Sequence, residues 1–216
     1  MTSIAGFIFD LDGVITETSE YHYQSWQQLA DEEGLPFTRE DNEQLRGVSR
    51  RVSLMRLLKG REFPEAKLQD MMFRKNQYYK ALLHHVTAKD CLPGVEDFLH
   101  DASASGLKLG IGSASRNARA VLEKLGLIDM FAVIGDGYSV VNSKPAPDLF
   151  VWVAGGLGLH VDQVVVFEDA EAGIDAAKTA GCLSVGIGTA NVNHADIVVG
   201  GLHDLTVEQV LTQLSR

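Results

Sequence analysis

Short apolar runs alternate with longer helical patterns along most of the chain. The runs that predict strands cover residues 7–9, 107–112, 132–134, 164–167, 183–187 and 197–199. Apolar residues spaced three to four apart predict helices at 94–104, 116–125, 147–156, 170–180 and from about 207 onward. Short strands that alternate with helices form a parallel sheet covered on both faces. We therefore predict an α/β fold with a Rossmann-like three-layer core.

The stretch between the first strand and residue 93 has helical patterns and no convincing strand. Helical periodicity covers residues 18–33, 39–44, 49–59 and 64–83, with Thr18 or Ser19 as the expected cap of the first helix. Helices inserted after one strand of an α/β domain predict a small separate domain over the mouth of the sheet. We assign residues 17–88 to this helical cap domain, and residues 1–16 and 89–216 to the α/β core domain.

The composition narrows the class of partner. The 216 residues are 45% hydrophobic and 22% charged, as in ordinary globular proteins, and the net charge is −10. This acidic excess argues against extended contact with nucleic acid or an anionic membrane, whereas a few local cations suffice for a small phosphate ligand. No apolar run has the length of a membrane span or the form of a signal peptide. We expect a cytoplasmic protein that binds a small molecule.

An acidic pair follows the first predicted strand. Asp10 and Asp12 lie two residues apart, and Gly13 allows the backbone to turn sharply after them. Ligands of open α/β sheets bind beyond the carboxyl ends of the strands, which is where this pair lies. Neighbouring carboxylates repel each other unless they bind a cation or share a proton, and oxygen ligands favour Mg²⁺. The alternative is a solvated turn, in which Asp and Gly are common.

Three more polar groups stand after later predicted strands. Ser113 opens a hydroxyl-rich turn before a helix, where backbone N–H groups can bind phosphate. Lys144 lies in a loop stiffened by two prolines and can hold a fixed charge against a phosphoryl group. In the acidic pair Glu168 and Asp169, Asp169 can ligate Mg²⁺ and Glu168 can act through a water. Each group also fits a structural role: Ser115 and Asp169 as helix caps, and Lys144 as a solvated surface residue.

Together these groups resemble the haloacid dehalogenase superfamily. The stretch Phe9-Asp-Leu-Asp-Gly-Val-Ile-Thr16 is similar to the Asp-x-Asp signature of its phosphotransferases, and the later groups follow in the superfamily's order. The resemblance implies that Asp10 is the nucleophile, which forms an aspartyl-phosphate, and that Asp12 is the general acid/base. It implies that Ser113 and Lys144 bind the transferring phosphate. The ligands that it implies for Mg²⁺ are Asp10, Asp12 through its backbone carbonyl, Glu168 and Asp169.

The predicted cap is similar to that of the β-phosphoglucomutase family within this superfamily. The similarity lies in residues 16–22 and in Asn42-Glu-Gln-Leu-Arg-Gly-Val-Ser-Arg50. It implies a distal phosphate site made of Arg50, Ser115, Arg116 and Asn117. It also implies that His22 reaches Asp12 or the hinge and that Thr18 holds Asp12. The further substrate-binding residues that it implies are Arg46, Gly47, Val48, Ser49, Lys75, Asn76 and Ala114.

Some of these cap residues have other interpretations. Arg46 and Arg116 stand where lysine is expected in the family, and this bears on phosphate geometry because Arg and Lys bind phosphate differently. The basic loop of Arg46, Arg50 and Arg51 can also be simply solvated. A single histidine such as His22 is more often a half-buried packing residue.

The activity that the resemblance implies is an isomerase reaction by intramolecular phosphotransfer, from β-D-glucose 1-phosphate to D-glucose 6-phosphate. Phospho-Asp10 phosphorylates the 6-hydroxyl to give β-glucose 1,6-bisphosphate, an intermediate and activator, which reorients and returns its other phosphate to Asp10. The resemblance further implies Mg²⁺, a sugar phosphate as the small-molecule partner, and a monomer. The alternatives are a sugar-phosphate phosphatase of the same superfamily, which passes the phosphoryl group to water, and a non-catalytic sugar-phosphate sensor.

Overall fold

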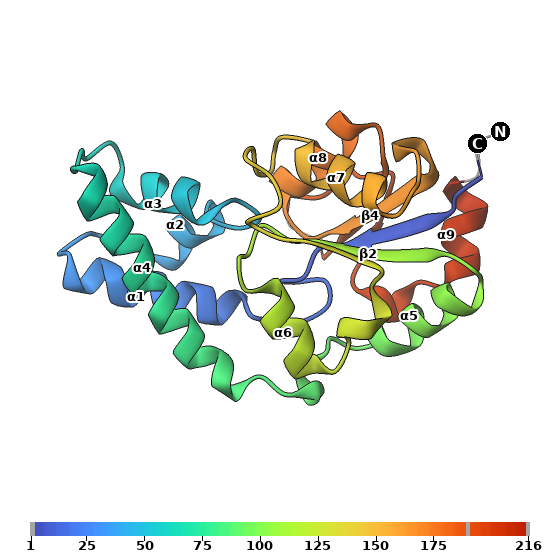
Figure 1. Cartoon of the computed structure of the whole chain (residues 1–216), viewed down its shortest axis with the longest axis horizontal. Helices are drawn as coiled ribbons and strands as arrows, with labels where there is room; N and C mark the ends of the chain where they lie inside the picture. Colours follow the sequence, from blue (N-terminus) through green and yellow to red (C-terminus); the bar gives the residue numbers. More distant parts are fainter. Residues whose placement is uncertain (1–2, 189–190, 215–216) are drawn as a thin grey trace.

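A parallel sheet of six strands forms the centre of the larger part of the molecule (Figure 1). The computed structural model describes residues 3–188 and 191–214. The strand order is β3-β2-β1-β4-β5-β6, and every neighbouring pair is parallel. The strands are β1 (Gly6–Phe9), β2 (Lys108–Gly112), β3 (Val133–Gly135), β4 (Val164–Glu168), β5 (Leu183–Ile187) and β6 (Ile197–Val199). Because β1 lies in the middle, the acidic pair after it stands at the centre of the sheet's carboxyl edge.

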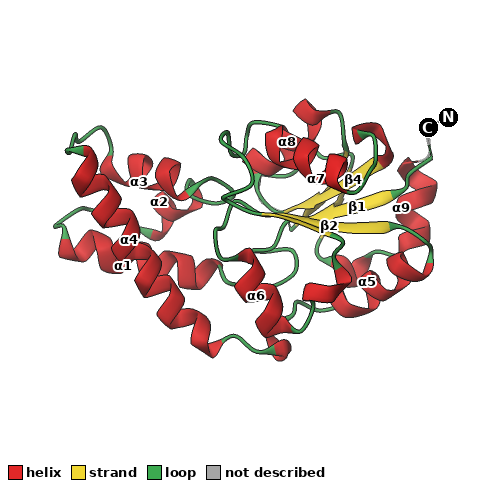
Figure 2. Cartoon of the chain, viewed as in Figure 1, coloured by secondary structure: helices red, strands yellow, loops and turns green. Residues whose placement is uncertain are grey.

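Helices cover both faces of this sheet (Figure 2). One face carries α5 (Val95–Ala104), α6 (Ala118–Leu125) and α9 (Val207–Leu214), and the other carries α7 (Asp148–Gly156) and α8 (Glu171–Ala180). The side chains of β1 alternate between the faces, so Phe7 and Phe9 belong to one hydrophobic cluster and Ile8 belongs to the other. The predicted α/β fold with a three-layer core is confirmed.

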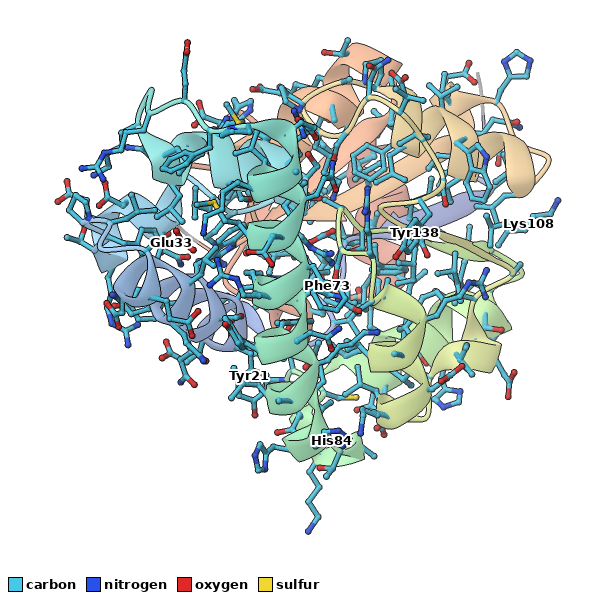
Figure 3. The ribbon with its side chains drawn as sticks, turned by 60° about the vertical axis from the view of Figure 1, so that its left-hand side comes forward. Tyr21, Glu33, Phe73, His84, Lys108 and Tyr138 are labelled. Carbon is cyan, nitrogen blue, oxygen red and sulfur yellow. The ribbon has the colours of Figure 1, made fainter. Side chains whose placement is uncertain are left out.

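A smaller, helical part is inserted after β1. Its helices are α1 (Ser19–Glu32), α2 (Arg39–Glu43), α3 (Arg50–Leu58) and α4 (Glu65–Leu82). They enclose a hydrophobic cluster of their own, which includes Trp26, Leu29, Leu54, Leu57 and Met71. Arg74 on α4 pairs with Glu32 and Glu33 at the end of α1, where Figure 3 labels Glu33. None of the helices in the described residues is both long and apolar enough to cross a membrane.

Two chain segments join the helical part to the core, and they run side by side. Thr16 and Cys91 form an antiparallel bridge, and the Leu92 N–H donates to the Ile15 carbonyl at 2.9 Å. The Thr16 hydroxyl also donates to the Asp90 carbonyl at 2.7 Å. The predicted domain boundaries, between residues 16 and 17 and between 88 and 89, fall beside this pairing.

The capping of α1 and the start of α6 differ from the prediction. Thr18 stands at the N-cap of α1, but its side chain makes no capping hydrogen bond, and its hydroxyl donates to Asp12. Helix α6 begins at Ala118 and not at residue 116. The residues before α6 instead form a turn closed by a hydroxyl bond, in which Ser115 Oγ accepts from the Asn117 N–H at 3.2 Å.

Candidate active site

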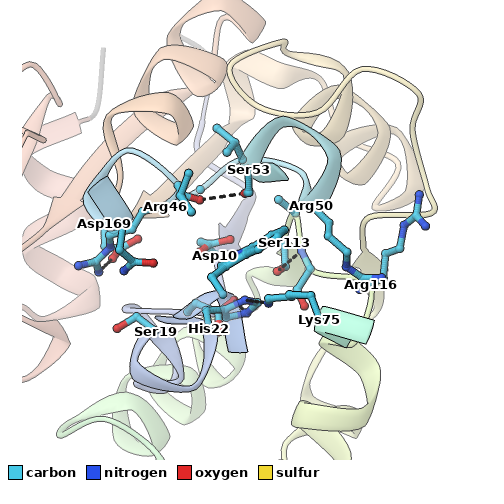
Figure 4. Close-up of a pocket in the computed structure, with 18 residues that line it drawn as sticks. Asp10, Ser19, His22, Arg46, Arg50, Ser53, Lys75, Ser113, Arg116 and Asp169 are labelled. Carbon is cyan, nitrogen blue, oxygen red and sulfur yellow. Dashed lines mark hydrogen bonds and ion pairs between the residues drawn. The ribbon is translucent and has the colours of Figure 1, made fainter. Parts of the chain in front are cut away.

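A cavity between the helical part and the carboxyl edge of the sheet gathers many of the predicted site residues (Figure 4). The predicted residues that line it are Asp10, Asp12, His22, Arg46, Gly47, Val48, Arg50, Lys75, Ser113, Ala114, Ser115, Arg116 and Asp169. The others do not line it directly: Thr18, Ser49, Asn76, Asn117, Lys144 and Glu168. Most of these six residues make a hydrogen bond or an ion pair with a residue that lines the cavity.

Lys144 joins the predicted nucleophile Asp10 to Glu168, a predicted metal ligand. Its Nζ lies 2.8 Å from Asp10 Oδ1 and 2.7 Å from Glu168 Oε2, and all three side chains are buried. Burial alone lowers the pKa of Lys144, but the Asp10 and Glu168 carboxylates outweigh burial and raise it above the usual value. Lys144 is therefore a fixed cation beside Asp10, and its alternative interpretation as a solvated surface residue is wrong.

Three carboxylates meet at this edge in an arrangement that suits a divalent cation. Asp10, Glu168 and Asp169 each offer an oxygen, and these oxygens lie within 4.8 Å of one another. Glu168 Oε1 is buried and has no hydrogen-bond partner among the described residues. A buried oxygen without a donor is costly, and Mg²⁺ or one of its waters satisfies such an oxygen. These residues therefore fit Mg²⁺, while the Asp12 backbone carbonyl stays a predicted ligand.

Arg46 reaches this carboxylate group from the cap loop, which we define as residues 44–49. Its guanidinium donates a hydrogen bond to Asp169 Oδ2 and lies 3.5 Å from Glu43 Oε2. Burial raises the pKa of Asp169 to about 6, and the Arg46 cation opposes this rise. In this structure the Arg46 guanidinium thus lies on a carboxylate, at the opposite side of the view in Figure 4 from Arg50 and Arg116.

Asp12 has surroundings different from those of Asp10. The Thr18 hydroxyl donates to Asp12 Oδ1, and His22 Nε2 lies 3.7 Å from Oδ2. Burial and the negative charge of Asp10 raise the pKa of Asp12 from 3.8 to about 7, although the Thr18 hydrogen bond lowers it. A carboxyl group with a pKa near neutrality can both give and accept a proton, as a general acid/base must.

His22 is held between Asp12 and a buried lysine. Lys75 Nζ lies 2.9 Å from His22 Nδ1, and the His22 and Tyr79 ring centroids are 4.0 Å apart. Burial and the neighbouring cations Lys75 and Arg50 hold the pKa of His22 well below its usual value, so the imidazole is neutral. Burial and the Arg50 cation also hold the pKa of Lys75 well below its usual value, and His22 Nε2 is the ring nitrogen that faces Asp12.

A basic wall stands on the side of the cavity formed by α4 and the turn before α6. Arg50 donates to Asn76 Oδ1 at 2.8 Å, and Asn117 donates to the same oxygen at 3.0 Å. Burial and the Arg116 cation lower the pKa of Arg50 to about 10. Within the described part of the chain, neither Arg50 nor Arg116 has a carboxylate ion-pair partner. Two guanidinium groups without an acid suit a phosphate dianion.

The turn after β2 offers hydroxyl donors between Asp10 and this basic wall. Ser113 Oγ accepts from the Ser115 N–H at 3.1 Å, and Ser115 Oγ accepts from the Asn117 N–H. Each hydroxyl uses an oxygen lone pair in these bonds, so its proton remains able to donate to a phosphate oxygen.

Two neighbours of Arg46 in the cap loop have structural contacts. Gly47 has a φ of 70°, and a Cβ atom there would lie 2.8 Å from the Ala170 Cβ. Only glycine therefore lets the loop lie against the β4–α8 turn. Ser49 accepts from the Val52 N–H at 3.3 Å and so caps α3.

Five further residues line the cavity, and the sequence analysis did not assign them to the site. They are Ser19, Trp26, Asn42, Leu45 and Ser53. Trp26 follows His22 by one helical turn, and Lys75 Nζ lies 5.0 Å from the centroid of its ring. This spacing was the available signal for Trp26, whose apolar helix face predicted only a packing role.

Comparison with known proteins finds relatives over nearly the whole chain. The protein is 42% identical to a β-phosphoglucomutase from Bacillus subtilis (strain 168) over 206 residues, which cover 93% of this chain and 91% of the relative. The crystal structure of β-phosphoglucomutase from Clostridium difficile matches with a TM-score of 0.95 and 40% identity, covering 98% of this chain and 97% of that chain. The similarity therefore includes both the core and the cap.

A more distant relative has a different named activity. A phosphorylated carbohydrates phosphatase from Thermotoga maritima is 30% identical over 176 residues, which cover 81% of this chain and 80% of the relative. The family model of haloacid dehalogenase-like hydrolases matches residues 7–187, from β1 to the end of β5. The chain therefore belongs to the haloacid dehalogenase-like hydrolase family, as its motifs predicted, and β-phosphoglucomutases are among its relatives there.

Proposed function

We propose that the protein is a β-phosphoglucomutase that interconverts β-D-glucose 1-phosphate and D-glucose 6-phosphate. The observation that carries the proposal is that cations stand at two places around one cavity: a buried lysine beside the lining residue Asp10, and two arginines of the lining. Lys144 lies beside Asp10. Arg50 and Arg116, which have no carboxylate ion-pair partner among the described residues, stand on the other side of the cavity. A sugar bisphosphate needs two such sites at once, one for the phosphate in transfer and one for the phosphate at rest. The 42% identity to a relative of that name supports the same reaction.

Asp10 is the proposed nucleophile. One of its carboxylate oxygens attacks the phosphorus in line, the bond from phosphorus to the sugar oxygen breaks, and an aspartyl-phosphate forms. Lys144, 2.8 Å from Asp10, is already placed to neutralise the oxygens of the transferring group, and the Ser113 hydroxyl can donate to them. When bound by Asp10, Glu168 and Asp169, Mg²⁺ supplies further positive charge to the phosphoryl oxygens.

Asp12 is the proposed general acid/base. As a carboxylic acid it protonates the departing sugar oxygen, and as a carboxylate it takes the proton from the hydroxyl that attacks phospho-Asp10. Its pKa of about 7 suits both steps at neutral pH. The Thr18 hydroxyl donates to the Asp12 carboxyl, and the neutral His22 lies beside it.

The cap is proposed to exclude water and to hold the resting phosphate. Arg50 comes from the cap, whereas Arg116 and Asn117 come from the core, so a phosphate bound to all three joins the two parts. β-Glucose 1,6-bisphosphate is the proposed intermediate and activator, because it can return either phosphate to Asp10. All of these groups belong to one chain, so a monomer is sufficient for the reaction.

The proposal is tested by removing the nucleophile. Asp10→Asn keeps the size of the side chain but weakens its oxygen as a nucleophile, so we expect turnover of β-glucose 1-phosphate to fall by about 10⁴-fold or more. The matched control is Asp101→Asn on the exposed face of α5, which should leave the rate unchanged. Normal turnover by Asp10→Asn, with the control also normal, would contradict the mechanism.

A phosphatase is the second candidate, and it is favoured by the 30% identity to the phosphatase from Thermotoga maritima. The carboxylates, Lys144 and Ser113 serve both reactions equally, because both pass through an aspartyl-phosphate. The two candidates differ only in whether water or a sugar hydroxyl receives the phosphoryl group. The products separate them, because a phosphatase releases inorganic phosphate and a mutase yields glucose 6-phosphate.

A further inference from the structure

The contact between Arg46 and Asp169 joins the cap to the metal-binding carboxylates. The Arg46 guanidinium donates to Asp169 Oδ2, and the two residues are 123 positions apart in the chain. The Asp169 side chain is only 9% exposed, whereas that of Arg46 is 31% exposed. A cap residue thus reaches into the core to neutralise one specific carboxylate.

The distribution of charge gives this contact its importance. Lys144 pairs with both Asp10 and Glu168 and makes no ion pair with Asp169 within the described chain. The third carboxylate of the group therefore has Arg46 as its close cationic partner. Arg46 occupies one of the oxygens through which Asp169 can bind a metal, while Glu168 Oε1 has no donor among the residues that the structure describes.

Packing holds the cap loop in the same place. Gly47 lies so close to the β4–α8 turn that an added Cβ would be 2.8 Å from the Ala170 Cβ and 3.9 Å from Glu168 Oε1. The loop therefore covers the carboxylate group on the side from which Arg46 enters. Movement of the loop would expose that side and would separate Arg46 from Asp169.

We propose that Arg46 is a built-in counter-ion of the metal site, which neutralises Asp169 until a divalent cation replaces it. A guanidinium and Mg²⁺ on the same buried carboxylate repel each other strongly, because little water screens them there. Binding of Mg²⁺ therefore releases Arg46 from Asp169 and loosens the cap loop, and closing of the loop opposes binding of Mg²⁺. This inference rests on the Mg²⁺ site of the proposed function.

The first test compares Mg²⁺ affinity by isothermal titration calorimetry in protein freed of metal. Arg46→Gln removes the competing cation, so its Kd for Mg²⁺ should be about threefold to tenfold lower than that of the wild type. Arg51→Gln is the matched control, because it removes the same charge from the helix that follows the cap loop, but Arg51 pairs with Glu65 at the surface. An unchanged Kd in Arg46→Gln would overturn the inference.

The second test distinguishes release of the loop from a general effect of charge. In the wild type, saturating Mg²⁺ should increase hydrogen–deuterium exchange in peptides that cover residues 44–49, and Arg46→Gln should show fast exchange without Mg²⁺. Exchange in this segment that does not respond to Mg²⁺ would overturn the inference.

Asp169→Asn separates this inference from the metal site itself. It should abolish calorimetric Mg²⁺ binding if the three carboxylates form the site. Loss of binding in Asp169→Asn together with no effect in Arg46→Gln overturns the role of Arg46 alone. A wild type that binds no Mg²⁺ overturns both the metal site and the role of Arg46.

Discussion

At the scale of single residues, the two carboxyl groups of the Asp-x-Asp pair differ through their neighbours. Asp10 has the buried cation Lys144 at 2.8 Å, whereas Asp12 has the neutral partners Thr18 and His22. Burial without a close cation raises the pKa of Asp12, so its carboxyl group can exist as an acid near neutral pH. Two aspartates of identical chemistry can therefore act as a nucleophile and as a general acid/base.

The raised pKa of Asp12 predicts a pH-dependent cost in stability. The pKa is about 7 in the folded protein and 3.8 in the reference state, so the folded state binds more protons between these values. Ionisation of the buried Asp12 carboxyl reduces the stability of the folded protein. This loss is absent below pH 3.8, grows as the pH rises, and is complete above pH 7. Asp12→Asn should therefore stabilise metal-free protein at pH 8 by about 2–4 kcal/mol, and much less at pH 4.5.

Urea unfolding at the two pH values, in the presence of a chelator, measures this effect. Wild type and Asp12→Asn are compared at each pH, so titrating groups that do not interact with Asp12 cancel in the difference. An equal difference at pH 8 and pH 4.5 would show that the substitution acts through packing and not through ionisation.

The arginine pair predicts where substrate affinity arises. Arg50→Ala removes charge-assisted bonds to the resting phosphate, and we expect kcat/KM for β-glucose 1-phosphate to fall by about 100-fold, or about 3 kcal/mol. In Arg51→Ala, kcat/KM should fall by less than about twofold, because Arg51 is exposed and pairs with Glu65. Equal losses in steady-state assays of both variants would contradict the distal site.

Residue types in short motifs allowed much of the site to be predicted. Asp10, Lys144 and Glu168 come together because each follows a strand or lies in a loop at one edge of a parallel sheet, which the sequence pattern already indicates. The partner of Arg46 could not be predicted in this way. It depends on where the cap loop rests against the core, and no local pattern encodes that distance.

At the scale of elements, strands were easier to predict than helix starts. The predicted strand at 183–187 matches β5, since a short apolar run between polar turns has clear ends. The start of α1 was predicted correctly, but Thr18 makes no capping hydrogen bond there, and its hydroxyl faces Asp12. The contact with Asp12 depends on how the segment before α1 lies against the core, which capping rules do not describe.

The cap helices predict a contrast in stability on α3. Leu54 is fully buried in the cap cluster, so Leu54→Ala should reduce the free energy of unfolding by about 2–4 kcal/mol. Its neighbour Met55 is 45% exposed, so Met55→Ala should change it by less than about 0.5 kcal/mol. Chemical denaturation followed by circular dichroism measures both. Similar losses of unfolding free energy in the two variants would show that α3 does not bury Leu54 and expose Met55 as described.

At the scale of the whole molecule, the reaction depends on how two parts meet. Asn76 on α4 accepts hydrogen bonds from Arg50 of the cap and Asn117 of the core, so the basic wall is assembled across the boundary between the parts. The sequence predicted that a helical cap stands over the sheet, and the fold confirms this insertion. It did not predict that Trp26 and Ser53 line the cavity, because that requires the packing of the whole cap.

In the proposed reaction a sugar hydroxyl, and not water, receives the phosphoryl group from Asp10. Phosphorus NMR of the protein with Mg²⁺, β-glucose 1-phosphate and a trace of β-glucose 1,6-bisphosphate distinguishes these two acceptors. We expect glucose 6-phosphate to accumulate as β-glucose 1-phosphate disappears, with little inorganic phosphate. Inorganic phosphate as the main product would refute the mutase reaction and identify the protein as a phosphatase.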